Sequence, residues 1–244
     1  MFELLRSLWL GRVDYLDAWD LQRELAALHL DAEIEDRLLL LEHPPSITLG
    51  RGADRANVLG SPGVLADQGI AVHEVDRGGD VTYHGPGQLV GYPIFNLSRH
   101  RKDLHWFLRQ MEEALILCLS RYDIEAGRFP PHTGVWVGDR KIAAIGIKVS
   151  RWVTTHGFAL NITSSPEDFG YIVPCGIRDY AVTSVYLESG AAPSMVEVGK
   201  SVVDAFTGVF GRTSEIDDSK ALAGLSEKSK KILTSGIDMG EIRC

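Results

Sequence analysis

The sequence is poor in cysteine, with only Cys118, Cys175 and Cys244 among its 244 residues. An odd number of cysteines at wide spacing favours free thiols in a reducing cytoplasm over a disulfide framework. Long apolar runs are also missing, and the chain does not start with basic residues followed by an apolar stretch. We therefore expect neither a membrane span nor a signal peptide. Basic residues are not in excess, since the net charge is −8, which argues against nucleic-acid binding.

The composition predicts a globular chain with a substantial core, because 45% of its residues are hydrophobic and 24% are charged. Strand-like and helix-like segments are mixed without strict alternation. This pattern predicts an α/β or α+β fold with a mixed sheet flanked by helices. We expect one domain over residues 1–211. Residues 212–244 are polar and rich in Ser, Lys, Asp and Glu, so we expect a partly disordered tail there.

Hydrophobic periodicity and capping residues place the expected elements along the chain. We expect helices over residues 15–30, 61–69, 103–122 and 194–210. We expect strands over residues 37–42, 47–49, 71–75, 89–95, 134–137, 141–149 and 152–162. Asp103 is a predicted N-cap, and Ser194 with Glu197 forms a predicted capping box. The pair Gly138-Asp139 predicts a tight hairpin between two strands.

The segment Arg77-Gly-Gly-Asp-Val-Thr-Tyr-His-Gly-Pro-Gly-Gln88 combines permissive backbone with many polar side chains. Glycine lets a backbone approach a ligand closely. A plain turn needs only one or two such residues, so this segment indicates the wall of a binding pocket. It resembles neither the Walker phosphate loop nor the dinucleotide fingerprint.

Cys175 lies between Pro174 and Gly176, on a constrained turn from which a nucleophile can project into a pocket. The alternative is a small buried hydrophobe, the usual role of a free cysteine. Cys118 fits that alternative because it lies on the apolar face of a predicted helix, and Cys244 is terminal.

A thiol nucleophile needs a base or a cation nearby to form the thiolate. His84 and His156 are candidates by context, and so is Lys141 at the start of the apolar strand segment Ile142-Ala-Ala-Ile-Gly-Ile147. A desolvated lysine can act as a base. The alternative for Lys141 is a solvated lysine at the end of a strand.

Small residues recur in two predicted strands, as Ala143, Ala144 and Gly146 and again as Gly157 and Ala159. They leave room for an elongated apolar group such as an acyl chain lying along the sheet. Tight strand packing also uses glycine and stays an alternative.

Four side chains could be considered as metal ligands: His43, His84, His156 and Cys175. None has the close paired spacing of structural zinc sites, so we expect no metal.

Taken together, several segments resemble the octanoyltransferase family, also called lipoate-protein ligase B. The matching segments are His43-Pro-Pro-Ser-Ile-Thr-Leu-Gly50, Arg77 to Gln88, Gly134-Val-Trp136, Lys141-Ile-Ala-Ala-Ile-Gly146, His156-Gly-Phe-Ala-Leu-Asn161 and Pro174-Cys-Gly-Ile177. They occur in the family's order over residues 40–185. The polar tail after Arg212 is where the chain departs from the family.

The resemblance implies the fold of the lipoate and biotin ligase catalytic domains and a cytoplasmic enzyme without a cofactor. It implies transfer of an octanoyl group, with Cys175 as the nucleophile and Lys141 as the residue that lowers the thiol pKa and moves protons. It also implies the following substrate contacts: Arg77, Gly78, Gly79, Asp80, Val81, Thr82, Tyr83, His84, Ala144, Ile145, Gly146, Gly157, Phe158 and Ala159.

The implied donor is octanoyl-acyl carrier protein. The implied acceptors are lipoyl domains of 2-oxoacid dehydrogenase complexes and the glycine cleavage H protein. Such partners are usually acidic, and this chain is acidic too, so docking requires a local basic rim. Lys148 with Arg151, and the run 99–102, are candidates, although solvated surface charge is equally ordinary.

Two other functions compete with octanoyl transfer. An ATP-dependent lipoate or biotin ligase has the same fold but needs no nucleophilic cysteine. A non-catalytic scaffold would bind acyl-proteins without turnover. The presence of both Lys141 and Cys175 weighs against the two alternatives.

Overall fold

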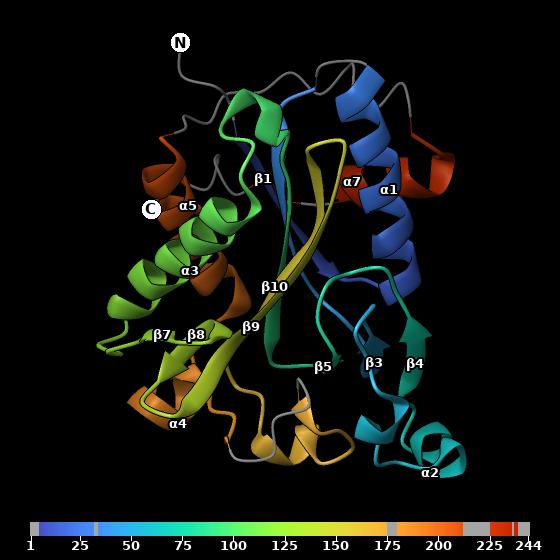
Figure 1. Ribbon diagram of the computed structural model, residues 1–244, viewed down its shortest axis with the longest axis vertical. Helices are drawn as coiled ribbons and strands as arrows, with labels where there is room; N and C mark the ends of the chain where they lie inside the picture. The colour runs from blue at the N-terminus through green and yellow to red at the C-terminus, as the bar shows by residue number, and fades with distance from the viewer. Residues whose placement is uncertain (1–4, 32–33, 175–179, 212–224, 236, 239–244) are drawn as a thin grey trace.

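The computed structural model describes residues 5–31, 34–174, 180–211, 225–235 and 237–238 (Figure 1). The helices are α1 (Tyr15–Asp31), α2 (Pro62–Asp67), α3 (Leu104–Ser120), α4 (Val185–Ser189), α5 (Met195–Phe210) and α7 (Glu227–Ser235). The strands are β1 (Leu5–Arg12), β2 (Asp36–Glu42), β3 (Ser46–Leu49), β4 (Ala71–Glu74), β5 (Val81–His84), β6 (Gln88–Ile94), β7 (Gly127–Phe129), β8 (His132–Val137), β9 (Arg140–Ser150), β10 (Val153–Asn161) and β11 (Ile237–Asp238). Every helix and strand expected from the sequence is confirmed.

The described strands form two sheets. The larger has eight strands in the order β11-β1-β2-β6-β10-β9-β8-β7, and the smaller has three in the order β4-β3-β5. In the larger sheet β1 and β2 are parallel while the other pairs are antiparallel. The smaller sheet is also mixed. The expected mixed sheet flanked by helices is therefore confirmed.

Helices cover both faces of the larger sheet, as Figure 1 shows: α3 and α5 lie on one side, and α1 and α7 on the other. The α3–α5 side holds a core of Leu, Ile, Val and Phe side chains that includes Cys118. Burial raises the pKa of the Cys118 thiol to about 12, so this cysteine is a core residue, as expected from its place on α3. A second core lies beneath α1.

Local capping chemistry fixes the helix starts as the sequence predicts. The Asp103 carboxylate accepts a hydrogen bond from the Trp106 N–H at 3.0 Å and begins α3. Ser194 and Glu197 form both bonds of a capping box at the start of α5. These bonds satisfy N–H groups that have no partner within the helix.

The described part of the 212–244 segment packs on the rest of the chain. Leu225 and Leu233 are buried in the core beneath α1, and β11 pairs with β1 in antiparallel register. The division into a domain over 1–211 and a partly disordered tail stays a prediction. No helix in the described ranges is both long and apolar enough to cross a membrane.

The larger sheet is closely packed at β10 beside β6. A methyl group at Gly157 would lie 2.0 Å from the carbonyl oxygen of Gly91 and 2.6 Å from Cδ of Pro93. Only glycine fits there without moving the β6 backbone, so β10 and β6 keep their register at this point.

We expect Gly157→Ala to lower the free energy of unfolding by about 1–3 kcal/mol, because the added methyl overpacks a buried strand pair. Gly208→Ala is the matched control. Gly208 lies in α5 with nothing within 4 Å of an added methyl, so alanine there should raise stability by about 0.5–1 kcal/mol. Urea unfolding curves measure both changes. A Gly157→Ala protein as stable as the wild type would contradict the close approach.

Candidate active site

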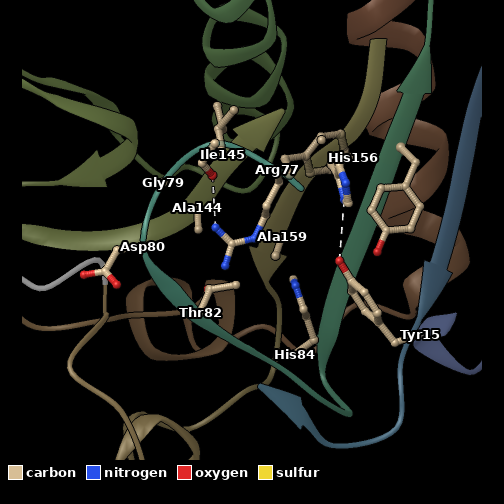
Figure 2. Close-up of a pocket in the computed structure, with 15 residues that line it drawn as sticks. Tyr15, Arg77, Gly79, Asp80, Thr82, His84, Ala144, Ile145, His156 and Ala159 are labelled. Atoms are coloured by element: carbon tan, nitrogen blue, oxygen red, sulfur yellow. Dashed lines mark hydrogen bonds between the residues drawn. The ribbon is translucent and has the colours of Figure 1, made fainter. Parts of the chain in front are cut away.

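A pocket lies where strand β5 and the loop that connects β4 to β5 meet β9 and β10 (Figure 2). Its lining residues are Tyr15, Arg77, Gly78, Gly79, Asp80, Thr82, His84, Tyr92, Ala144, Ile145, Gly146, His156, Gly157, Phe158 and Ala159. The structure thus brings together twelve of the fourteen residues predicted to contact substrate. Their role toward a substrate stays a prediction.

Val81 and Tyr83 do not line this pocket. Successive side chains of a strand point to opposite faces, and on β5 Thr82 and His84 point into the pocket. Val81 and Tyr83 therefore point the other way, into the core of the smaller sheet.

Arg77 is buried and binds the loop to β3. Its Nη2 donates to the Thr48 carbonyl oxygen at 2.8 Å and to Thr48 Oγ1 at 2.9 Å, and its Nη1 donates to the Gly78 carbonyl oxygen at 3.0 Å. These bonds spread the positive charge over backbone and hydroxyl oxygens. The guanidinium therefore holds one wall of the pocket in place.

The loop after Arg77 packs directly on β9. The Gly78 N–H donates to the Ile147 carbonyl oxygen at 2.9 Å, and a methyl at Gly146 would lie only 3.0 Å from the Gly78 carbonyl oxygen. Gly146 therefore allows tight packing of backbone on backbone, which was the alternative to a role in the pocket. Gly146 also lines the pocket, because the loop packed against it forms one wall.

Polar side chains at one end of the pocket are joined in a hydrogen-bond network. His156 Nε2 donates to Asp76 Oδ1 at 2.8 Å, and Lys148 donates to Asp76 Oδ2 at 2.5 Å. With its proton on Nε2, His156 accepts at Nδ1 from the Tyr15 hydroxyl, 3.5 Å away. His156 has a φ of +58°, and its N–H donates to Gln22 Oε1 at 2.7 Å.

Burial lowers the pKa of His156, although Asp76 opposes the effect. Burial alone would raise the pKa of Asp76, but the hydrogen bonds from Lys148 and His156 outweigh it and lower the pKa. His156 is therefore a neutral, oriented imidazole beside a carboxylate. Its bonded neighbours are Tyr15 and Asp76, at the opposite end of the pocket from Lys141.

His84 and His43 also lie buried near this end. His43 Nδ1 donates to the Val13 carbonyl oxygen at 2.7 Å, so its Nε2 accepts from the Tyr92 hydroxyl, also at 2.7 Å. Burial lowers the pKa of His43 to about 4. Burial, together with the neighbouring His43 and Arg77, holds the pKa of His84 well below its usual value.

Lys141 lies at the start of β9 and lines a second, smaller cavity. Only 8% of the residue is exposed, so the solvated strand-end interpretation is wrong. Its Nζ lies 4.7 Å from the centre of the Trp136 ring, a distance typical of cation–π contacts. Pro174 lines the same cavity.

Cys175, the predicted nucleophile, is outside the described residues, as is the neighbouring Gly176. The structure does describe both flanks of that segment. Pro174 lines the Lys141 cavity, and Tyr180 packs edge-on against Trp136, with ring centres 5.6 Å apart.

The two cavities share Thr82, Ala144 and Ala159 as lining residues. Ala144 and Ala159 are partners in the β9–β10 pairing. The Lys141 cavity and the larger pocket therefore adjoin, with methyl groups between them. The structure thus brings Lys141 near the predicted substrate wall, whereas His156 lies further along β10, where it pairs with Ile147. His84 lies between the two, because its Nδ1 is 3.3 Å from Oε1 of Gln88, which lines the Lys141 cavity.

Sequence reasoning missed Tyr15, Tyr92 and Asp76. Tyr15 was placed at the start of a helix and Tyr92 inside a strand, but nothing local indicates that both face a pocket. Asp76 immediately precedes the glycine-rich segment, and this position was an available signal. Its partners His156 and Lys148 lie 80 and 72 residues away in the sequence.

The two basic clusters proposed for docking differ in the structure. Lys148 is bonded to Asp76 beside the pocket. Arg99 donates to the Ile34 carbonyl oxygen, and His100 bonds Asp36 at 2.6 Å with almost no exposed side chain. His100 is therefore part of the packed interior. Among the described residues, no three His, Cys, Asp or Glu side chains gather where they could hold a metal ion.

The neutral buried histidines predict that acid destabilises the fold. In the unfolded chain His43 takes up a proton near its ordinary pKa of 6.5, but in the folded chain it does so only near 4. Between these values the unfolded state binds more protons, so stability is present above pH 6.5 and is lost as pH falls. We expect His43 alone to cost about 2 kcal/mol of unfolding free energy at pH 5 relative to pH 7.5.

Urea unfolding at the two pH values measures this loss. His43→Gln should reduce the difference between them, and His105→Gln, which replaces an exposed histidine of α3, should leave it at the wild-type value. A wild-type stability that does not change between pH 7.5 and pH 5 would contradict the buried neutral histidines.

Comparison with known proteins adds sequence relatives and similar folds. Residues 14–207 match the family described as the lipoyl protein ligase A/B catalytic domain. The chain is 50% identical over 201 residues to an octanoyltransferase of Solibacter usitatus, covering 82% of this chain and 90% of the relative. It is 49% identical over 212 residues to an octanoyltransferase of Chloroflexus aurantiacus, covering 86% and 95%.

Solved structures share the fold at low sequence identity. A lipoate-protein ligase A bound with ATP has a TM-score of 0.72 at 17% identity, covering 96% of this chain and 93% of that one. A bipartite lipoate protein ligase of Thermoplasma acidophilum has a TM-score of 0.67 at 15% identity, covering 100% and 98%. At these identities the likeness concerns the fold alone.

Proposed function

This chain belongs to the lipoyl protein ligase A/B catalytic-domain family and is an acyltransferase, and from that premise we propose that it transfers an octanoyl group to a lysine of a lipoyl domain. The donor is octanoyl-acyl carrier protein, and the acyl group passes through a thioester on Cys175. The acceptors are lipoyl domains of 2-oxoacid dehydrogenase complexes and the glycine cleavage H protein. The reaction is the first step of endogenous protein lipoylation and takes place in the cytoplasm.

The observation that carries this proposal is the cavity lined by both Lys141 and Pro174, the residue before Cys175. A lysine amine and a cysteine thiol that share a small, largely closed cavity can exchange a proton. The cavity adjoins a pocket whose floor bears Ala144, Ala159 and glycines. Such a floor suits an extended apolar chain better than a polar ligand.

The proposed chemistry has two steps. In its neutral form the Lys141 amine accepts the Cys175 proton, and the thiolate attacks the octanoyl thioester, forming acyl-Cys175 and releasing the donor thiolate, which takes back the proton. The acceptor lysine then attacks the acyl-Cys175 carbonyl, and the amide forms as the Cys175 thiolate leaves and is reprotonated through Lys141. The first step exchanges one thioester for another, so it needs no nucleotide, and amide formation drives the second.

The pocket-lining residues then contact the acyl group. Close approach of backbone to the acyl group is possible at the glycines of the lining, Gly78, Gly79, Gly146 and Gly157. Thr82 and the two alanines line both cavities, so they would contact the first carbons of the chain next to the thioester. Backbone N–H groups of this wall are candidate donors to the oxyanion of each tetrahedral intermediate. Val81 and Tyr83 act indirectly, by holding β5 in the smaller sheet.

Two rival functions give different outcomes. An ATP-dependent ligase would act on free octanoate and ATP and would form no acyl-cysteine. A scaffold would bind lipoyl domains without any turnover. Identities of about 50% to octanoyltransferases, against 17% to a ligase bound with ATP, favour the transferase.

The acyl-enzyme tests the proposal directly. After mixing with an octanoyl thioester, an intact-mass spectrum should show one octanoyl adduct that hydroxylamine removes. Cys175→Ser should abolish this thioester. Cys118→Ala is the matched control, because Cys118 is buried in the core with a raised pKa, and it should keep the adduct. A thioester adduct that persists on Cys175→Ser, identified by its removal with hydroxylamine at neutral pH, would refute the assignment.

Lys141→Ala separates the role of the lysine in the same assay. Loss of a positioned acid–base group should slow adduct formation by a factor on the order of 10²–10⁴. It should also shift alkylation of the thiol to higher pH, because a nearby cation favours the thiolate. An unchanged alkylation profile would remove Lys141 from the mechanism and leave His84 and His156 as candidates.

A further inference from the structure

The pocket has two distinct ends along the β9–β10 pair. At one end it adjoins the Lys141 cavity, at the level where Ala144 pairs with Ala159. At the other end Ile147 pairs with His156. In Figure 2 the side chains of Tyr15, His84 and His156 lie together at this second end, and Asp80 lies on the opposite side. We call this second end the far end.

Two tyrosine rings close the far end. Tyr15, the first residue of α1, is 2% exposed, and Tyr92 of β6 is 3% exposed. Behind Tyr15 stand further rings, because its centre lies 5.0 Å from that of His43 and 5.4 Å from that of His73. The ring of His84 is stacked on the Tyr15 ring at 5.8 Å.

The hydroxyl groups of the two tyrosines already have partners. The Tyr15 hydroxyl is bonded to His156, which is held in turn by Asp76. The Tyr92 hydroxyl donates to His43. Burial raises the pKa values of both tyrosines above their usual value, so both rings are neutral. The far end is therefore a fixed wall of ring carbons whose hydroxyl groups are satisfied.

The length of the pocket fits a particular chain. An extended eight-carbon acyl chain is about as long as three residues of a strand, which rise about 10 Å. A chain that starts beside Ala144, next to the Lys141 cavity, therefore ends beside Ile147 and its partner His156. Tyr15 lies at that point, bonded to His156.

We propose that Tyr15, supported by Tyr92, is the stop that sets the length of the acyl chain this pocket accepts. The terminal methyl of an eight-carbon chain meets the Tyr15 ring. A longer chain would have to displace a ring that is stacked on His73 and His84, tilted against His43 and hydrogen-bonded to His156. This inference rests on the proposed function for the identity of the acyl group, but its test does not require acyl transfer.

The test compares straight-chain free fatty acids of six to twelve carbons by isothermal titration with the full-length protein. The affinity of the wild type should rise about fourfold with each buried methylene up to eight carbons. The ten-carbon acid should bind no more tightly than the eight-carbon acid. Tyr15→Ala opens space toward His43 and His73 that the surroundings refill only partly. Its optimum should move to a chain about two to four carbons longer, with the ten-to-eight affinity ratio rising about tenfold.

Three further variants make the result specific. Tyr15→Phe keeps the ring and should keep the eight-carbon optimum. Tyr15→Leu keeps an apolar side chain in the core and should lengthen the optimum by about two carbons, so it carries the test if Tyr15→Ala fails to fold. Leu16→Ala, the exposed neighbour on α1, should bind with the wild-type length profile.

The inference is overturned if, in both Tyr15→Ala and Tyr15→Leu, the ratio of affinities for the ten-carbon and eight-carbon acids stays within twofold of the ratio measured for Leu16→Ala. It is also overturned if no fatty acid binds to the wild type. Failure of the proposed function has a different signature, because the fatty acids would bind with the expected profile while octanoyl thioesters leave no adduct on Cys175. The two results are read from separate measurements.

Discussion

The site depends on the close contact between the loop that starts at Arg77 and strand β9. A single backbone hydrogen bond, from Gly78 N–H to the Ile147 carbonyl oxygen, joins the two sheets at this point. Glycine at position 146 lets the backbones approach, and Arg77 fixes the loop to Thr48 on the other side. If the loop stood further from β9, the pocket would lose one wall.

Two groups of side chains lie on the two sides of this contact. On the side of the Lys141 cavity, the amine lies over the Trp136 ring in a cavity that Pro174 also lines. On the far side, tyrosine and histidine rings are bonded to one another, to a carboxylate and to backbone. We propose that the first group acts on a thioester carbonyl and that the second bounds the acyl chain. His156 belongs to the second group, whereas His84 contacts both, because it is stacked on Tyr15 and bonded to Gln88 of the Lys141 cavity.

The sequence predicted those features that depend on neighbours in the chain. Asp103 and Ser194 cap their helices through hydrogen bonds to residues three positions further along the chain. Such bonds can be inferred from residue type and spacing alone. Strand β5 is different, because its four residues lie inside the glycine-rich segment, where no strand boundaries are predicted from the sequence, and the pairing with β3 makes it a strand. Strand β1 was missed for the same reason, since its partners β2 and β11 lie elsewhere in the sequence.

The pocket shows the same division between local and distant information. Its glycine-rich wall and its small-residue floor were recognisable as motifs. Tyr15 was not, because its bonded partner His156 lies 141 residues away and reaches it through a left-handed backbone at that histidine. A contact of that kind follows from the packing of α1 on β10, which a single sequence does not encode locally. The reaction could therefore be inferred from the sequence, while the boundary of the pocket required the structure.

The most direct measurement is a crystal structure of the octanoyl-enzyme, trapped by soaking the protein with an octanoyl thioester. We expect electron density continuous with Cys175 Sγ, with Lys141 Nζ within hydrogen-bond reach of the reacting atoms. The chain should run past Ala144 and Ala159 and end against the Tyr15 ring. An acyl group on another residue, or a chain leaving the pocket between the two sheets, would contradict this expectation.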